Sequence, residues 1–200
     1  MDVREALLRA AIKVFAETGT RGATTRRIAQ EAEVNEVTLF RHFKSKGDLL
    51  RAAVQFFASQ ATMHALPDRP QDPRAELVQW CRGYHRELHK VRALIRRAMG
   101  EFEEHPDNCA QSMQASVRIA NELVSYLGEL RRLGLASGHW DARAAAAMLM
   151  GALFSDALGR DTMPERYPYS MRDAVEKYVD LLLSAIGTRT ASDRGLVEQQ

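Results

Sequence analysis

The sequence predicts an all-α protein of about nine helices. Apolar residues recur every three to four positions along most of the chain, which is the period of an amphipathic helix. No stretch sustains the apolar-polar alternation of a half-buried strand. Apolar residues make up 46% of the chain and charged residues 27%, a balance typical of a globular domain with a real core.

The first helix is predicted from apolar residues at positions 3, 7, 10, 11, 14 and 15. It should end at Gly19, because glycine readily adopts the left-handed conformation that closes a helix. Thr24 or Thr25 can cap a second helix with its side-chain oxygen. The inner face of this second helix consists of Ile28, Ala29 and Ala32.

Asn35 is the expected cap of a third helix, in which Val37, Phe40 and Phe43 should point partly inward. The segment from Ser45 to Asp48 has the form of a capping box and should open a longer fourth helix. Prolines 67, 70 and 73 then mark a linker, since proline cannot continue a helix. Further helical periodicity covers residues 74–90, 92–104, 107–133, 141–159 and 171–187.

The charge distribution singles out the N-terminal part of the chain. Residues 1–50 contain nine Lys/Arg and seven Asp/Glu, whereas the other 150 residues contain 19 of each. Within residues 21–46 the basic residues outnumber the acidic ones six to three. A local positive excess favours contact with an anionic partner such as DNA.

Cysteine content and hydropathy predict a cytoplasmic protein without a membrane segment. Cys81 and Cys109 are the only cysteines, so we expect no disulfide framework. The longest apolar run, residues 144–154, is much shorter than the roughly 20 residues of a membrane-spanning helix. The charged N-terminus lacks the apolar segment of a secretory signal.

Residues 24–46, TTRRIAQEAEVNEVTLFRHFKSK, carry the strongest functional signal. Two short amphipathic segments flank a tight break, and basic or hydrogen-bonding side chains crowd both. This is the layout of a helix-turn-helix, which presents its second helix to the major groove of DNA. The pattern predicts a sequence-specific binder of double-stranded DNA.

The segments TTRRIAQEA, TLF and HFKSK, at their spacing here, resemble the TetR family of bacterial transcriptional regulators. The resemblance covers about residues 11–54. It implies a helix-turn-helix DNA-binding domain at residues 1–50, a helical ligand-binding and dimerisation domain at 51–187, and a flexible tail at 188–200. It also implies a homodimer that binds an operator, without a cofactor or catalytic residues. We expect a repressor, because a dimer bound at a promoter excludes the polymerase.

The resemblance further implies the DNA contacts of individual residues. Arg26 would bind a guanine edge, Glu36 a cytosine amino group and Val37 a thymine methyl group. Several of the other contacts would be to backbone phosphates. The full predicted set is Thr25, Arg26, Arg27, Asn35, Glu36, Val37, Thr38, Arg41, His42, Lys44 and Lys46.

Three residues depart from the family pattern. Glu33 stands in the turn, where glycine is common, so the turn must accommodate a side chain and a negative charge. Phe40 replaces a frequent tyrosine and so lacks a phosphate-binding hydroxyl. Arg41 stands where an aromatic residue is frequent and can supply a backbone contact instead.

The resemblance implies that the last two helices form the dimer interface. Small residues at four-residue spacing form a stripe along the helix at 141–159, and such a stripe permits close helix packing. Apolar residues follow one face of the final helix, although both sets could equally form the core of one chain. The predicted interface consists of Ala147, Gly151, Ser155, Gly159, Val175, Val179, Leu182, Leu183 and Ile186.

The resemblance also implies a cavity for a small ligand. Aromatic and methionine side chains in the helical region would suit an apolar or amphipathic molecule. The candidates are Trp80, Tyr84, His85, Met99, Phe102, Met113 and Met148. Ligand binding would shift the dimer between conformations of different DNA affinity.

The sequence also bears on three other functional classes, namely a metal or thiol sensor, an enzyme and an architectural DNA binder. Cys81, His85 and His89 share one helix face at spacings of four, which allows a metal or thiol sensor as an alternative. No phosphate-binding glycine loop, zinc-protease motif or nucleophile elbow indicates an enzyme. A non-specific architectural DNA binder is a further alternative, but the neutral charge of residues 51–200 disfavours it.

Overall fold

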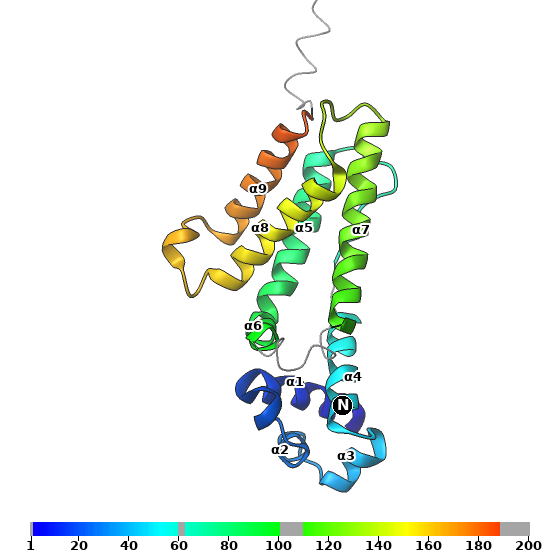
Figure 1. Ribbon diagram of the computed structural model, residues 1–200, viewed down its shortest axis with the longest axis vertical. Coiled ribbons are helices and arrows are strands. Elements are labelled where there is room, and N and C mark those ends of the chain that lie inside the picture. Colours follow the sequence, from blue (N-terminus) through cyan, green and yellow to red (C-terminus); the bar gives the residue numbers. More distant parts are fainter. Residues whose placement is uncertain (1, 60–62, 101–109, 189–200) are drawn as a thin grey trace, which may run out of the picture. The chain divides into compact units, whose positions relative to one another are not determined.

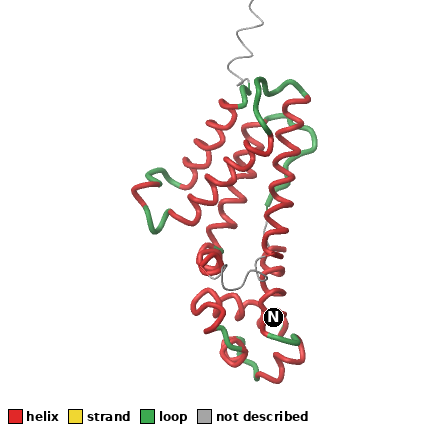
Figure 2. Tube along the Cα trace, in the orientation of Figure 1, coloured by secondary structure: helices red, strands yellow, loops and turns green. Residues whose placement is uncertain are grey.

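The computed structural model describes residues 2–59, 63–100 and 110–188, and within these ranges it contains helices and no strand (Figures 1 and 2). Nine α-helices and a short 3-10 helix make up the described elements. The predicted all-α class and the expected number of helices are therefore confirmed. No helix in the described part of the chain is long and apolar enough to cross a membrane.

The chain folds as two compact units. The first comprises residues 1–61 and 91–116, and the second comprises residues 62–90 and 117–200. The expected boundary near residue 50 separates a DNA-binding domain from a ligand-binding domain, and this functional division stays a prediction. The two observed units are defined instead by which residues pack together. The predicted tail lies almost entirely outside the described residues.

The first unit is built on its N-terminal helix. It contains α1 (Val3–Gly22), α2 (Thr25–Glu31), α3 (Glu36–His42), α4 (Lys46–Ser59) and α6 (Arg92–Gly100). Helix α1 packs against α2, α4 and α6. Its buried residues Leu7, Ala11 and Val14 join Ile28 of α2 and Leu39 of α3 in one apolar core.

The predicted helix boundaries in this unit are largely confirmed by the caps. Thr24 accepts a hydrogen bond from the Arg27 amide and caps α2. Ser45 caps α4, since its Oγ accepts from the Asp48 amide at 3.1 Å. Helix α1 extends three residues beyond its predicted end, but Gly19 inside it has φ of 70° and breaks the helical geometry where we expected it.

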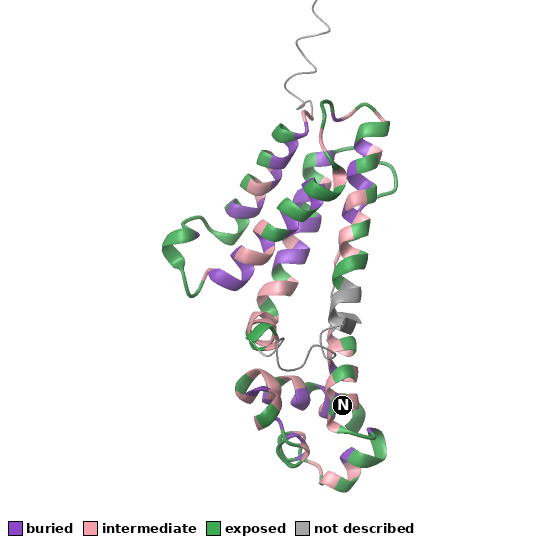
Figure 3. Cartoon of the chain, viewed as in Figure 1, coloured by how far each residue is buried: buried purple, intermediate pink, exposed green. Residues whose placement is uncertain are grey.

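The second unit centres on α5 (Pro73–Lys90), which packs against α8 (Ala142–Gly159) and α9 (Met171–Ala185). Helix α7 (Ala110–Arg132) belongs to this unit from residue 117, and a 3-10 turn at Pro164–Arg166 lies between α8 and α9. Figure 3 shows buried positions along all of these α-helices. The apolar core includes Trp80, Leu77, Leu127, Leu153, Val179 and Ile186.

A buried polar network joins three helices of the second unit. Asp156 of α8 is fully buried, and its carboxylate accepts hydrogen bonds from Nε2 of His85 in α5 (2.8 Å) and from Tyr178 Oη in α9 (2.8 Å). Arg160, one turn along α8, donates Nε and Nη2 to the same carboxylate at 2.6–3.0 Å. Breaking one partner of such a buried ionic network typically costs about 3–5 kcal/mol.

The network sets the protonation of its members. Burial lowers the pKa of His85, and the neighbouring Arg160 cation adds to this, although Asp156 opposes both. Burial alone would raise the pKa of Asp156, but hydrogen bonds from Arg160, His85 and Tyr178 outweigh it and lower that pKa. His85 is therefore neutral near pH 7 and donates its Nε2 proton to a charged Asp156.

We expect the thermal stability of the protein to fall below about pH 6.5, the ordinary pKa of histidine. His85 and Asp156 both have a lower pKa in the folded protein than in the unfolded chain, so the unfolded chain binds more protons as the pH falls. The stability that each group contributes is therefore complete above its pKa in the unfolded chain and is lost as the pH falls through its pKa in the folded protein. Melting temperatures from pH 8 to 5 would show this slope for the wild type. His85→Gln should flatten it, whereas His139→Gln, at an exposed position, should not. Equal slopes for the two variants would contradict the role of His85.

Candidate nucleic-acid interface

The turn between α2 and α3 is closed around Glu33. Its φ of 57° places it in the left-handed region, where it is the one non-glycine residue among those described. The Val34 amide donates to the Ala29 carbonyl at 2.9 Å and fixes the turn. A side chain in this conformation costs about 1 kcal/mol or more. The turn therefore accepts the departure at Glu33 at some cost, and the glutamate is exposed.

Asn35 and Thr38 form the cap of α3. Asn35 Oδ1 accepts hydrogen bonds from the Thr38 amide (2.7 Å) and the Thr38 hydroxyl (2.8 Å). The predicted cap is thus confirmed. Because this oxygen already has two donors, Asn35 positions the start of the helix, and a DNA contact from it would come through its amide nitrogen.

A short hydrogen bond joins the start of α2 to the start of α3. The Thr25 hydroxyl donates to Glu36 Oε1 at 2.5 Å, and both side chains are half-buried. Both residues were predicted to contact DNA, one at a phosphate and one at a base. In the DNA-free protein they instead contact each other, so a phosphate must compete with Glu36 for the Thr25 hydroxyl.

The outer face of α3 carries exposed side chains of mixed character. Val37 is 63% exposed and Phe40 49%, while Arg41 and Lys44 are also exposed. Val37, Phe40 and Arg41 fall on one side of α3, whereas Lys44 follows the end of the helix at His42. The expectation that Val37 and Phe40 point inward was wrong: Leu39 and Phe43 already fill the core side, so Val37 and Phe40 face outward.

The remaining predicted contacts divide by exposure. Arg26, Arg27 and His42 are exposed. Lys46 is half-buried, and its Nζ donates to the Thr20 carbonyl at 2.7 Å, which links α4 to the end of α1. Phe40 is not among the predicted DNA contacts, although its spacing of three from Val37 places it on the same face of α3.

The predicted dimer residues do not form one surface. Ala147 and Gly151 are exposed, but Gly159 is buried beneath Tyr167, where an added Cβ would lie 2.7 Å from the ring. Ser155 shares a hydrogen bond with the Tyr167 hydroxyl at 2.6 Å. The predicted residues of α9 and the adjoining Ile186 are core residues of this chain, buried to 8% exposure or less: Val175, Val179, Leu182, Leu183 and Ile186.

The predicted ligand residues are also separated. Trp80 and Tyr84 stack at 5.5 Å within the core, and Trp80 Nε1 donates to Glu122 at 3.2 Å. Met99 and Met148 are 58% and 73% exposed, in different units. Phe102 and the side chain of Met113 lie outside the described residues. An open groove of about 620 Å³ does occur in the second unit, but none of the seven predicted residues lines it.

The contacts of Cys81, His85 and His89 do not support a metal or thiol sensor. Cys81 is fully buried, and burial strongly raises the pKa of its thiol, which keeps it protonated and unreactive. His85 is held by Asp156, and His89 Nδ1 lies 3.4 Å from the Ala157 carbonyl. The described residues contain no cluster of potential metal ligands.

Residues 7–53 match the family model described as "Bacterial regulatory proteins, tetR family". Over these residues the chain therefore carries the helix-turn-helix segment of the TetR family. An HTH-type transcriptional repressor of Mycobacterium tuberculosis is 27% identical over 180 residues, covering 90% of each chain. The class C tetracycline repressor protein of Escherichia coli is 35% identical over 74 residues, 37% of this chain and 34% of the repressor.

Solved TetR-type structures share the whole fold. A transcriptional regulator of Rhodococcus sp. RHA1 superimposes with a TM-score of 0.73 at 20% identity, covering 94% of this chain and 99% of that one. A TetR regulator of Agrobacterium tumefaciens gives 0.71 at 23%, covering 96% and 98%. These likenesses show the fold, whereas the family match at residues 7–53 and the regulator from M. tuberculosis indicate a DNA-binding transcriptional regulator with its helix-turn-helix in α2 and α3.

We expect Glu36→Gln to strengthen binding to DNA of any sequence several-fold. The substitution removes a negative charge at the start of α3 and weakens the hold on the Thr25 hydroxyl, so both changes favour phosphate. If Glu36 also reads cytosine, preference at that base should shift toward adenine, which glutamine recognises.

Fluorescence anisotropy with labelled duplexes at two salt concentrations would measure both effects. Glu31→Gln is the matched control: it removes the same charge from α2, where Glu31 pairs with Lys13 at 2.5 Å. Unchanged binding by Glu36→Gln, or an equal gain by Glu31→Gln, would contradict this account.

Proposed function

We propose that the protein is a homodimeric repressor that binds a near-palindromic operator and is released from it by a small-molecule ligand. The observation that carries the proposal is the outer face of α3, where Val37, Phe40 and Arg41 are exposed beside the two helix starts, with the exposed Lys44 just beyond the end of the helix. A regulator that only bound phosphates would not need apolar side chains there, because phosphates are read by charge and hydrogen bonds.

The exposed residues divide into those that would contact DNA bases and those that would contact the DNA backbone. Arg26 would donate two hydrogen bonds to guanine, and Val37 would contact a thymine methyl group. Phe40 would add apolar contact next to it. Arg27, Arg41, His42 and Lys44 would bind phosphates, as would the hydroxyls of Thr25 and Thr38 once their partners release them.

The dimer would form through the exposed sides of α8 and α9. Ala147, Met148 and Gly151 of α8 lie on its outer side, and Leu181 of α9 is 69% exposed. Large apolar side chains exposed on adjacent helices favour burial against a second copy. Two-fold symmetry would then place two recognition helices about one turn of DNA apart, which requires a near-palindromic site.

Ligand release is proposed from the family. The relative named as a tetracycline repressor pairs repression with a small molecule. A ligand that favours one separation of the two DNA-binding units would move the dimer off its operator. Repression itself is supported by the likeness to the transcriptional repressor of M. tuberculosis.

Selection of bound fragments from a random duplex library should yield a near-palindrome bound at least about 10³-fold more tightly than random DNA. Arg26→Ala should cost about 1–3 kcal/mol and relax specificity at one base position in each half-site, because a bidentate guanine contact is lost. Arg118→Ala, at an exposed position of α7, should leave binding unchanged. Recovery of no enriched sequence would overturn site-specific recognition.

Gly151→Leu should weaken the dimer at least about tenfold. Within one chain a Cβ added at the exposed Gly151 meets no atom within 4 Å, so we expect the fold to tolerate leucine there, but a closely packed interface could not accommodate it. Sedimentation equilibrium would measure the association. Gly128→Leu is the control, since α7 also offers open space there. A dimer unchanged by Gly151→Leu would place the interface elsewhere.

A further inference from the structure

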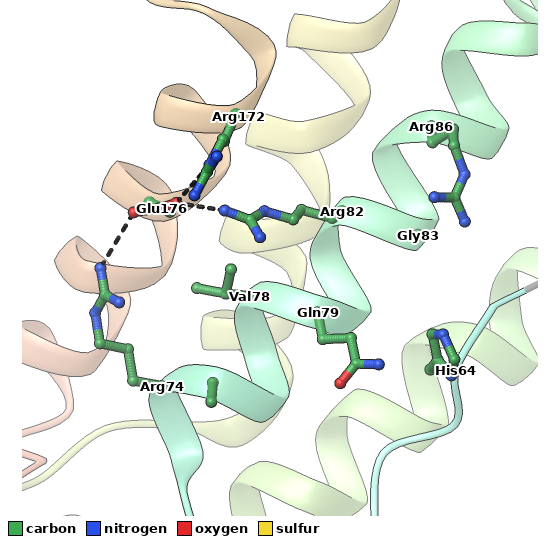
Figure 4. Close-up of a pocket in the computed structure, with 10 residues that line it drawn as sticks. His64, Arg74, Val78, Gln79, Arg82, Gly83, Arg86, Arg172 and Glu176 are labelled. Carbon is green, nitrogen blue, oxygen red and sulfur yellow. Dashed lines mark hydrogen bonds and ion pairs between the residues drawn. The ribbon is translucent and has the colours of Figure 1, made fainter.

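An open groove of about 620 Å³ runs between α5 and α9 in the second unit (Figure 4). Four arginines line it, namely Arg74, Arg82 and Arg86 of α5 and Arg172 of α9. Among the described residues that line the groove, Glu176 is the single carboxylate. The volume of the groove lies in the range of small-molecule binding sites.

Glu176 is shared among three of these arginines. Arg82 donates Nη2 to Glu176 Oε1, while Arg74 Nη2 and Arg172 Nε each lie 3.6 Å from its oxygens. Arg74 has a better partner in Asp180, to which it donates two hydrogen bonds at 2.7 and 3.0 Å. Arg82 and Arg172 therefore share one negative charge, and the groove keeps a positive excess.

Arg82 is also incompletely hydrogen-bonded. Its Nε–H is buried and has no acceptor in the described structure. A buried donor without a partner is unfavourable, and a charged one more so. In Figure 4 the Arg82 side chain lies across the groove between α5 and Glu176, so an acceptor bound in the groove could approach its guanidinium.

We propose that this groove binds a small organic anion through a carboxylate or phosphate group. The anionic group would bind the guanidiniums of Arg82 and Arg172, whereas Arg86, which also lines the groove, already pairs with Glu87 at 3.6 Å. The apolar part of the molecule would lie over Val78 and Ala75. Anion binding in this groove does not depend on the proposed release from an operator, because it can be measured on the protein alone.

The charge arrangement of the groove predicts opposite effects of two substitutions. Glu176→Gln removes the internal competitor and should tighten anion binding several-fold. Gln79→Glu adds a carboxylate at an exposed position of the lining while every arginine and ion pair stays, so it should weaken binding without affecting folding.

Isothermal titration calorimetry of the full chain without DNA, at about 20 mM salt to limit screening, would test this with phenyl phosphate and benzoate as probes. We expect one binding site. The probe that binds more tightly will identify phosphate or carboxylate as the preferred group. Arg82→Gln and Gln79→Glu should each bind at least about tenfold more weakly, because a charge-assisted contact is lost or opposed.

Arg143→Gln, on the exposed side of α8, is the matched control and should bind as the wild type does. Equal weakening by Arg143→Gln and Arg82→Gln would mean diffuse surface attraction and overturn the site. Unchanged affinity of Gln79→Glu for the probes would also overturn the site. The same conclusion would follow if neither probe bound to the wild type or to Glu176→Gln at concentrations up to about 10 mM. Circular dichroism of each variant verifies that it is folded.

Discussion

A single buried carboxylate holds the second unit together. Asp156 of α8 accepts hydrogen bonds from His85 of α5 and Tyr178 of α9, and Arg160 balances its charge. Desolvating an ion is costly, and only complete hydrogen bonding by its neighbours makes it tolerable. The network therefore permits one register of the three helices. That register fixes which sides of α8 and α9 remain exposed and where the arginines of α5 and α9 meet.

In the first unit the corresponding constraint is the filled apolar core. Leu39 of α3 and Phe43 at its C-cap fill the core side, so the rotation of this short helix is determined and Val37, Phe40 and Arg41 must face outward. The caps fix its start, because Asn35 holds the Thr38 amide. A helix of seven residues has little stability of its own, so its usefulness as a reading element comes from this packing.

The sequence was sufficient to predict the helices and the DNA-binding motif because those signals are local: periodicity, caps and the spacing of TTRRIAQEA and HFKSK. It was insufficient where one helix has two apolar faces. Helix α8 is apolar all round, so its stripe of small residues could not reveal that Gly151 is exposed while Gly159 lies beneath Tyr167. The Asp156 network and the shared Glu176 join residues 71 and 94 positions away, and no local pattern signals such pairs.

Helix α9 connects the features of the second unit within a few residues. Glu176 contributes to the groove, Tyr178 to the Asp156 network, and Leu181 to the proposed dimer face. A helix moves as a rigid element, so a displacement of Glu176 is transmitted to Leu181 less than two turns away. An anion that took over the guanidiniums of Arg82 and Arg172 would loosen their hold on Glu176, and with it one of the ties between α5 and α9. The groove is thus placed where occupancy would bear directly on the helix that carries part of the proposed dimer face.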